Sequence, residues 1–207
     1  ALPAEHKGTH MSRFLGLLKD HERPLCKKTL VELMQSMLTA LESEAGCIDF
    51  DFPFFVKKLA PVSKLECLMN YRVHYRVEHK NGRTSVTQTV TVPVTSLCPC
   101  SKEISDYGAH NQRSHVTISA RLSGDLSLER QIRYAEQSAS CELWSRLKRV
   151  DEKYVTEKAY ENPKFVEDLV RDVAVALNGD KNIEAYRVQA ENFESIHKLL
   201  KAGKTNR

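Results

Sequence analysis

Apolar residues in the first quarter of the chain recur at spacings of three and four, the period of an α-helix with one buried face. Met11, Phe14, Leu15 and Leu18 form a first such stripe, after a start at Gly8 where Thr9 can cap the helix. A second stripe begins after residue 27 and comprises Leu30, Leu33, Met34, Met37, Leu38 and Leu41. The pattern predicts two amphipathic helices.

The period then changes to two, which is typical of strands with one face buried. Residues 47–58 and 67–79 alternate in this way, and residues 85–93 return as a partner strand. Asn81-Gly82 lies between the last two runs, and this dipeptide favours a tight hairpin turn. The sequence therefore predicts antiparallel strands here.

The second half of the chain repeats the alternation of strands and helices. Residues 116–122 and 183–189 read as strands, and residues 128–150 read as one helix with a stripe from Ile132 to Leu147. Pro163 is suited to the first turn of a further helix, which Asn178-Gly179 would end.

This order of elements predicts an α+β fold in which antiparallel sheets carry paired helices on one face. Two more strands before residue 1 would make the halves alike, so we interpret the chain as two tandem units. Residues 1–82 would be the first half without its N-terminal strands, and residues 83–197 the second half. Residues 198–207 are short and basic, and we expect a solvated tail there.

Composition narrows the class of protein. The 207 residues are 41% hydrophobic and 28% charged, as in ordinary globular proteins, and the net charge of +4 is too mild to indicate nucleic-acid binding. No apolar run approaches the roughly 20 residues that span a bilayer, so we expect no membrane partner. The start lacks signal-peptide character, and the six cysteines are scattered, which indicates a reducing cytoplasm.

Candidate chemistry concentrates in residues 93–115, which hold two thiols and two imidazoles in a turn-rich segment between strands. In a cytosolic chain such a cluster favours metal binding or an activated nucleophile. Cys98 and His110 are close enough in sequence to bind one ion, but two ligands bind weakly, so a third must come from elsewhere. The alternative is a buried thiol and a hydrogen-bonded loop histidine.

Cys100 poses a separate question, because the stiff Pro99 makes it awkward for both thiols to bind one ion. A thiol beside a metal and a lysine should have a lowered pKa, which suits proton transfer near neutral pH. We therefore interpret Cys100 as a catalytic acid or base. A second metal ligand, or a thiol that oxidises with Cys98, remains the alternative.

A group of cations lies near the cluster and near the first helix. A hydroxyl and an ammonium beside a metal site can hold phosphate oxygens, and a helix start also favours anions. We therefore predict a triphosphate site, although each cation alone could be an ordinary surface residue. The candidates are Ser101, Lys102, Arg113, Lys7, His10 and Arg13.

Several long blocks of sequence carry a resemblance that covers residues 2–197. They are TSLCPCSKEISDYGAHNQRSHV, LPAEHKGTHMSRF, FPFFVKKLAPVS, DEKYVTEKAYENPKFVEDLVRDV and ENFESIH. In these blocks the chain resembles the prokaryotic GTP cyclohydrolases of type IB. The resemblance implies the tunnelling fold, in which subunits associate edge to edge into a barrel. It also implies a homotetramer with sites at subunit interfaces.

The same resemblance implies a site. Glu152 and His197 would complete the metal-ligand set with Cys98 and His110. Cys98, His110 and His197 would form the catalytic group together with Cys100. The ion would be Zn²⁺, Mn²⁺ or Fe²⁺, and no organic cofactor is expected. Two carboxylates would bind the substrate: Glu167 would anchor the guanine base, and Glu194 is a weaker candidate for the same pocket.

The reaction implied is the hydrolysis of GTP to 7,8-dihydroneopterin triphosphate and formate, the first step of tetrahydrofolate biosynthesis. The ion would lower the pKa of a bound water so that hydroxide attacks C8 of the guanine.

Two alternatives come from other classes of protein. A nitrile reductase of the same fold would use Cys100 as a covalent nucleophile on a 7-deazaguanine, with NADPH as reductant; the chain has no glycine-rich dinucleotide motif. A non-enzymatic zinc module or nucleic-acid-binding protein is the other. Aromatic residues are sparse at 7%, and neither an RNP-like nor a helix-turn-helix pattern is present.

Overall fold

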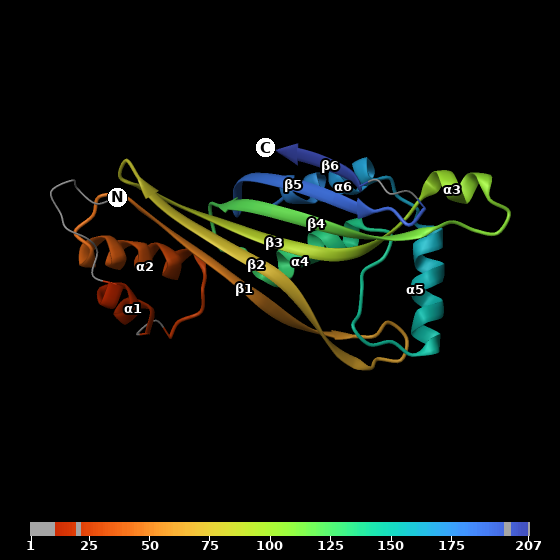
Figure 1. Cartoon of the computed structure of the whole chain (residues 1–207), viewed down its shortest axis with the longest axis horizontal. Coiled ribbons are helices and arrows are strands. Elements are labelled where there is room, and N and C mark those ends of the chain that lie inside the picture. The colour runs from red at the N-terminus through yellow and green to blue at the C-terminus, as the bar shows by residue number, and fades with distance from the viewer. Residues whose placement is uncertain (1–10, 20–21, 197–199, 207) are drawn as a thin grey trace.

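The computed structural model describes residues 11–19, 22–196 and 200–206. Its strands form one antiparallel sheet in which sequence order and spatial order are the same (Figure 1). The strands are β1 (Gly46–Leu59), β2 (Glu66–Lys80), β3 (Arg83–Leu97), β4 (Asn111–Leu122), β5 (Ile183–Phe193) and β6 (Leu200–Asn206).

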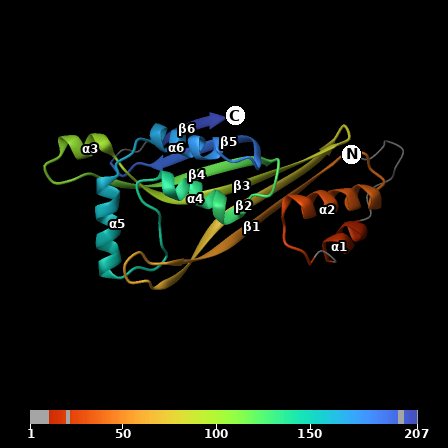
Figure 2. The ribbon, with the colours of Figure 1, turned by 180° about the vertical axis from the view of Figure 1, so that it is seen from behind.

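The helices are α1 (Met11–Lys19), α2 (Lys27–Ala40), α3 (Pro99–Ile104), α4 (Leu128–Ser138), α5 (Arg149–Glu161) and α6 (Val166–Asn178). Three of them, α2, α4 and α6, cover the same face of the sheet, as the view from behind shows (Figure 2). The expected α+β class with helices on one face is confirmed, and the architecture is consistent with the tunnelling fold. No described helix has the length and apolar character needed to cross a membrane.

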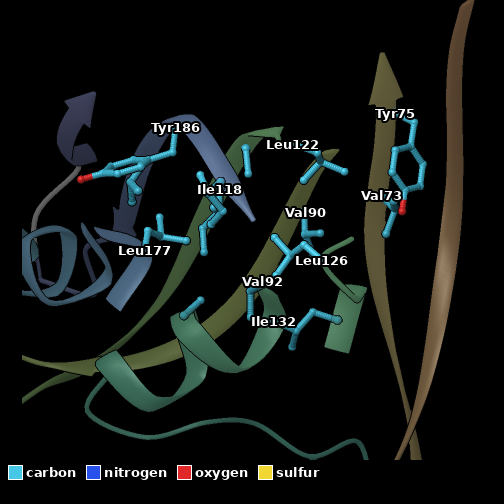
Figure 3. Packing of buried hydrophobic residues seen from close by; sticks show 14 of the residues in the cluster. Val73, Tyr75, Val90, Val92, Ile118, Leu122, Leu126, Ile132, Leu177 and Tyr186 are labelled. Atoms are coloured by element: carbon cyan, nitrogen blue, oxygen red, sulfur yellow. The ribbon is translucent and has the colours of Figure 1, made fainter. Parts of the chain in front are cut away.

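Alternation along the strands separates an apolar face from a polar one. Side chains such as Val90, Val92 and Ile118 are fully buried, and they pack under α4 with Ile132 (Figure 3). The other face carries hydroxyl pairs across neighbouring strands, including Thr89 and Ser119, whose oxygens lie 2.9 Å apart. The predicted period of two is therefore confirmed, because one face of each strand meets the helices.

The Asn-Gly hairpin is confirmed between β2 and β3. Asn81 and Gly82 both have positive φ, at 51° and 71°, which a two-residue turn of the primed type requires. Lys80 pairs with Arg83 beside the turn. The proposed boundary at residue 82 falls in this turn, and the sheet continues through it, so the division into two tandem halves remains a prediction.

The single helix expected over residues 128–150 is wrong. Helix α4 ends at Ser138, and the chain then runs beside β3, where Cys141 and Thr95 exchange backbone hydrogen bonds of 2.9 and 3.3 Å. Helix α5 begins only at Arg149. Tertiary backbone pairing has overridden a helical apolar stripe, which is the common reason for such errors.

The solvated tail expected over residues 198–207 is also wrong for its described part, residues 200–206, because β6 pairs with β5 from Phe193↔Leu200 to Arg187↔Asn206. Gly203 lies against α6 so closely that an added Cβ would be 3.0 Å from Cγ2 of Val170. The basic composition concealed the strand. Strand β6 pairs with the backbone groups of β5 on the side away from β4, and a short polar segment can do this as well as an apolar one.

Candidate active site

Cys98 and His110 lie at the ends of two paired strands. Leu97 ends β3 and pairs with Asn111, which starts β4, so the residues just beyond them face each other. The Cys98 N–H donates to the His110 carbonyl over 3.4 Å, and α3 begins directly after Cys98. The structure thus brings together the two nearest predicted ligands, through a short helix that sequence analysis did not anticipate.

Ser101 closes this loop from inside. Its hydroxyl donates to the Cys98 carbonyl and accepts from the His110 N–H, each over 3.2 Å. The next residue, Lys102, donates to the Tyr160 carbonyl over 2.7 Å, with its ammonium 4.2 Å from the centre of the Tyr160 ring. Ser101 therefore stabilises the loop itself, and Lys102 connects it to α5. Their role in binding phosphate remains a prediction.

The imidazole of His110 is oriented by a residue from the end of β5. Nδ1 lies 2.9 Å from Oγ of Ser195, so Nε2 is the ring nitrogen left for a ligand. Metal-binding histidines are commonly held in this way through their other nitrogen. Cysteine sulfur and imidazole nitrogen are donor types that suit a divalent transition metal, and here they are carried by residues whose backbones are in contact.

A cavity of about 130 Å³ opens beside Cys98, between the ends of β4 and β5 and the start of α6. It brings Cys98 together with both carboxylates expected to bind the base. Glu167 is exposed in the first turn of α6, and Glu194 directly follows β5. The lining residues are Cys98, Pro99, Gln112, Lys164, Phe165, Val166, Glu167, Asn192 and Glu194.

The rest of the predicted metal site is not assembled in the described part of one chain. Within residues 11–19, 22–196 and 200–206, no three His, Cys, Asp or Glu side chains are grouped closely enough to hold an ion. Glu152 lies exposed in the first turn of α5 and forms no such group with Cys98 and His110. His197 lies outside the described residues.

Asp151, which precedes Glu152, fixes the start of α5. Its carboxylate is fully buried and accepts hydrogen bonds from the N–H groups of Val62, Ser63 and Lys148 and from the Ser63 hydroxyl, over 2.6 to 2.9 Å. Burial raises the pKa of this carboxyl, but the hydrogen bonds from Ser63, Lys148 and Val62 outweigh it and hold the pKa below its usual range. Sequence analysis missed this residue.

The remaining predicted substrate residues are dispersed. Arg13 lies on α1 at the other end of the molecule from α3 (Figure 1), where it donates to the Ala40 carbonyl over 2.9 Å. Arg113 is exposed on β4, paired with Thr95 and Phe193 of the neighbouring strands. Cys100 is exposed on α3. Lys7 and His10 lie outside the described residues.

Sequence analysis also missed two amides in the cavity wall, Gln112 and Asn192. Both are almost fully buried, and Asn192 accepts a hydrogen bond of 2.6 Å from Ser114. Their signal is the strand period: Gln112 has the same parity as the buried Val116 and Ile118 of β4, where an apolar residue would be expected. A polar residue on a buried parity, next to a Cys/His cluster, is the pattern to look for.

Comparison with known proteins decides the family. The family model for type I GTP cyclohydrolase FolE2 matches residues 1–199. The chain belongs to this family. The GTP cyclohydrolase FolE2 of Paraburkholderia xenovorans is 61% identical over 196 residues, which are 95% of this chain and 73% of the relative. Those of Burkholderia ambifaria and Burkholderia vietnamiensis are 61% and 60% identical, with the same coverage.

This membership makes the chain an enzyme that hydrolyses GTP, with GTP cyclohydrolase function in folate biosynthesis. It also sets aside the nitrile reductase and the non-enzymatic zinc module as readings of the sequence.

Proposed function

We propose that the cyclohydrolase reaction of this chain takes place at the Cys98 cavity and depends on one divalent metal ion. The observation that carries the proposal is the pair formed by Cys98 and His110, with the imidazole held through Nδ1 so that Nε2 is available. A thiolate and an imidazole suit Zn²⁺, and a carboxylate in the set keeps Mn²⁺ and Fe²⁺ possible. The ion would supply Lewis acidity that activates water near neutral pH. No organic cofactor is needed.

Glu152 and His197 are the further ligands in this proposal. Glu152 is presented by a helix start that Asp151 clamps to the loop of Val62 and Ser63, so its backbone position is fixed. No set of three ligands is complete among the described residues of one chain. In this proposal His197 adds a ligand, and Glu152 reaches the ion either after a movement of α5 or from a second chain. This fits a site formed at a subunit interface.

The base is held by carboxylates in the cavity. Glu167 accepts hydrogen bonds from N1–H and the exocyclic amine of guanine, and Glu194 lines the same cavity. This places C8 toward the Cys98–His110 pair. Cys100, exposed one residue beyond Pro99, gives a proton at N7 so that the imidazole ring opens. The products are formate and 7,8-dihydroneopterin triphosphate.

The triphosphate would reach the cations around the loop. Lys102 can turn from the Tyr160 carbonyl to a phosphate oxygen. Ser101 precedes it on α3, and Arg113 lies near the start of β4. Arg13 is on α1, at the opposite end of the molecule from α3, so in this proposal it binds the triphosphate held by a neighbouring subunit. Lys7 and His10, close to Arg13 in sequence, are assigned with it.

We also propose a homotetramer in the cytoplasm. Among the described residues, β1 and β6 are the outermost strands of the sheet, β1 is 14 residues long, and unpaired edges of this length favour pairing with another copy. The helices leave one face of the sheet to hydroxyl and charged side chains, as a water-filled barrel interior requires. All six cysteines are free thiols, the state expected in a reducing compartment.

The experiment is to strip the purified protein with a chelator and restore single metals. Formate and the fluorescence of the oxidised pterin are then measured with GTP as substrate. We expect both signals to vanish on stripping and to return with at least one of Zn²⁺, Mn²⁺ and Fe²⁺. Cys98→Ala should lose metal and activity together, and Cys100→Ala should keep metal but lose activity.

Cys47→Ala is the matched control, because this thiol is exposed on β1 away from the cavity. Full turnover by metal-free protein, or by Cys98→Ala, would overturn the proposed metal site. It would leave the family assignment intact.

A further inference from the structure

Gln112 holds an oxygen that the fold does not use. Among the residues that the structure describes, its Oε1 is the buried side-chain atom that lacks a hydrogen-bond partner. The side chain is 8% exposed and lines the cavity beside Cys98. Buried acceptors are nearly always paired in native proteins, so an open one in a cavity wall calls for a donor that arrives from outside.

The polar groups around Gln112 already satisfy one another. Ser114, two residues along the same strand, donates to Asn192 over 2.6 Å and lies 2.8 Å from the Ser96 hydroxyl. These partners leave the Gln112 oxygen unmatched. A purely structural amide in this position would be expected to join such a cluster.

The cavity offers two kinds of acceptor for one edge of a base. A carboxylate at Glu167 takes the N1–H and one N–H of the exocyclic 2-amine of guanine. The amine has a second N–H, which needs another acceptor when it is removed from water. An uncharged oxygen on the same cavity wall meets that need without adding charge next to Glu167 and Glu194.

We propose that the Gln112 carboxamide accepts the second N–H of the guanine 2-amine and is a specificity-determining residue for this amine. The proposal rests on the placement of guanine at Glu167 described above. Sites built to bind a substrate N–H reject the analogue that lacks it, because the acceptor is then left buried and unpaired. The analogue here is inosine triphosphate, which has the N1–H and the triphosphate but no 2-amine.

The test compares GTP as substrate with inosine triphosphate as competitor, using the metal-loaded enzyme. The competitor's inhibition constant reports its affinity whether or not it turns over. Gln112→Met keeps the length of the side chain and removes the acceptor. We expect kcat/KM for GTP to fall about 3- to 10-fold, the worth of one hydrogen bond, and the inhibition constant of inosine triphosphate to change less than twofold.

Gln35→Met is the matched control, because Gln35 is exposed on α2, and it should change neither value. Unchanged GTP kinetics in Gln112→Met, or equal losses for the two nucleotides, would overturn the proposal. The thermal midpoints of Gln112→Met and Gln112→Ala are measured alongside. If both variants unfold, the amide belongs to the fold and the proposal fails as well.

Glu167→Gln separates this proposal from the placement of the base. If that variant binds GTP normally, guanine is not held at Glu167 and the base site itself is wrong. If it weakens GTP while Gln112→Met changes nothing, the base site stands and only the role of Gln112 is lost.

Discussion

The hydroxyl of Ser195 lies 2.9 Å from Nδ1 of His110, although 85 residues separate the two in sequence. Ser195 follows β5, and His110 precedes β4, so the pairing of these strands brings the two side chains together. The contact orients the imidazole ring and occupies Nδ1, so that Nε2 is the nitrogen available to a ligand. The segment after β5 therefore supports the loop of Cys98 and His110 and also supplies Glu194 to the cavity.

Ser195→Ala should weaken metal binding without removing a ligand. Loss of a hydrogen bond to the outer nitrogen of a metal-binding histidine typically costs about 10- to 100-fold in affinity or activity. We expect the dissociation constant for Zn²⁺ to rise by at least about tenfold, measured by competition with a chromophoric chelator. Ser36→Ala, on the exposed surface of α2, is the control. Equal constants for Ser195→Ala and the parent would show that the hydroxyl does not orient the ring.

Lys58 should be a main support of the segment between α4 and α5. Its side chain is 11% exposed and forms ion pairs with Glu136 and Glu142, and its ammonium donates to the Leu143 carbonyl over 2.9 Å. Removing one partner of a buried pair leaves the other charge uncompensated, which costs about 3–5 kcal/mol. Lys58→Met is expected to lower the free energy of unfolding by about that amount, measured by urea denaturation.

Lys57→Met provides a neighbouring comparison. Lys57 lies 3.3 Å from Glu66, but the two side chains are 76% and 62% exposed, and such surface pairs are worth less than about 1 kcal/mol. If the two variants lost similar amounts of unfolding free energy, burial of the Lys58 ion pairs would not explain their contribution to stability.

The same cluster explains where prediction from sequence failed. Strands β1 to β5 and helix α2 follow local periodicity, because one face of each meets a single apolar layer, and these were predicted correctly, unlike β6. The stripe from Ile132 to Leu147 is also helical in period, yet the chain leaves the helix at Ser138. Backbone pairing of Cys141 with Thr95, supported by Lys58, is a contact between distant residues that local pattern cannot reveal.

The candidate site divides in a similar way. Cys98 and His110 could be paired from sequence because one short loop joins them. The Glu167 carboxylate has no local feature that distinguishes it from an ordinary helix glutamate, and only the resemblance pointed to it. The cavity that joins it to Cys98 depends on how α6 packs beside β4 and β5. Gln112 could have been suspected from its parity alone, whereas its lack of a partner required the structure.

Gly203 should be intolerant of side chains because β6 runs close to α6. A Cβ there would lie 3.0 Å from Cγ2 of Val170 and 3.3 Å from the Val166 carbonyl oxygen. Gly203→Leu would force the strand away from the helix, and overpacking of this kind costs about 1–3 kcal/mol. Thermal unfolding should show a lower midpoint.

Gly16 is the opposite case, since an added Cβ meets nothing within 4 Å inside α1. Gly16→Ala should raise stability by up to about 1 kcal/mol, because alanine is the better helix former. A Gly203→Leu protein as stable as the parent would contradict the packing of β6 described above.

Asp151 should make stability depend on pH in the acid range. Its folded-state pKa is held below the value of about 3.9 expected for an unfolded chain, because buried hydrogen bonds from Ser63, Lys148 and Val62 favour the carboxylate. The stabilisation is thus fully present above about pH 4 and is lost as the pH falls through that value toward the folded-state pKa. Urea denaturation of the parent should show unfolding free energy that declines in this window.

Asp151→Asn tests this directly, because both carboxylate oxygens accept from backbone N–H groups, so in either orientation the amide NH2 faces at least one of these donors. The variant should be less stable than the parent at pH 7, and the gap should narrow as the pH falls below about 4, since the parent then loses its carboxylate too. Asp125→Asn, in an exposed loop, should follow the parent curve. Parallel curves for Asp151→Asn and the parent at all pH values would mean that ionisation of Asp151 does not contribute to the pH dependence of stability. The start of α5 would then be held by packing alone.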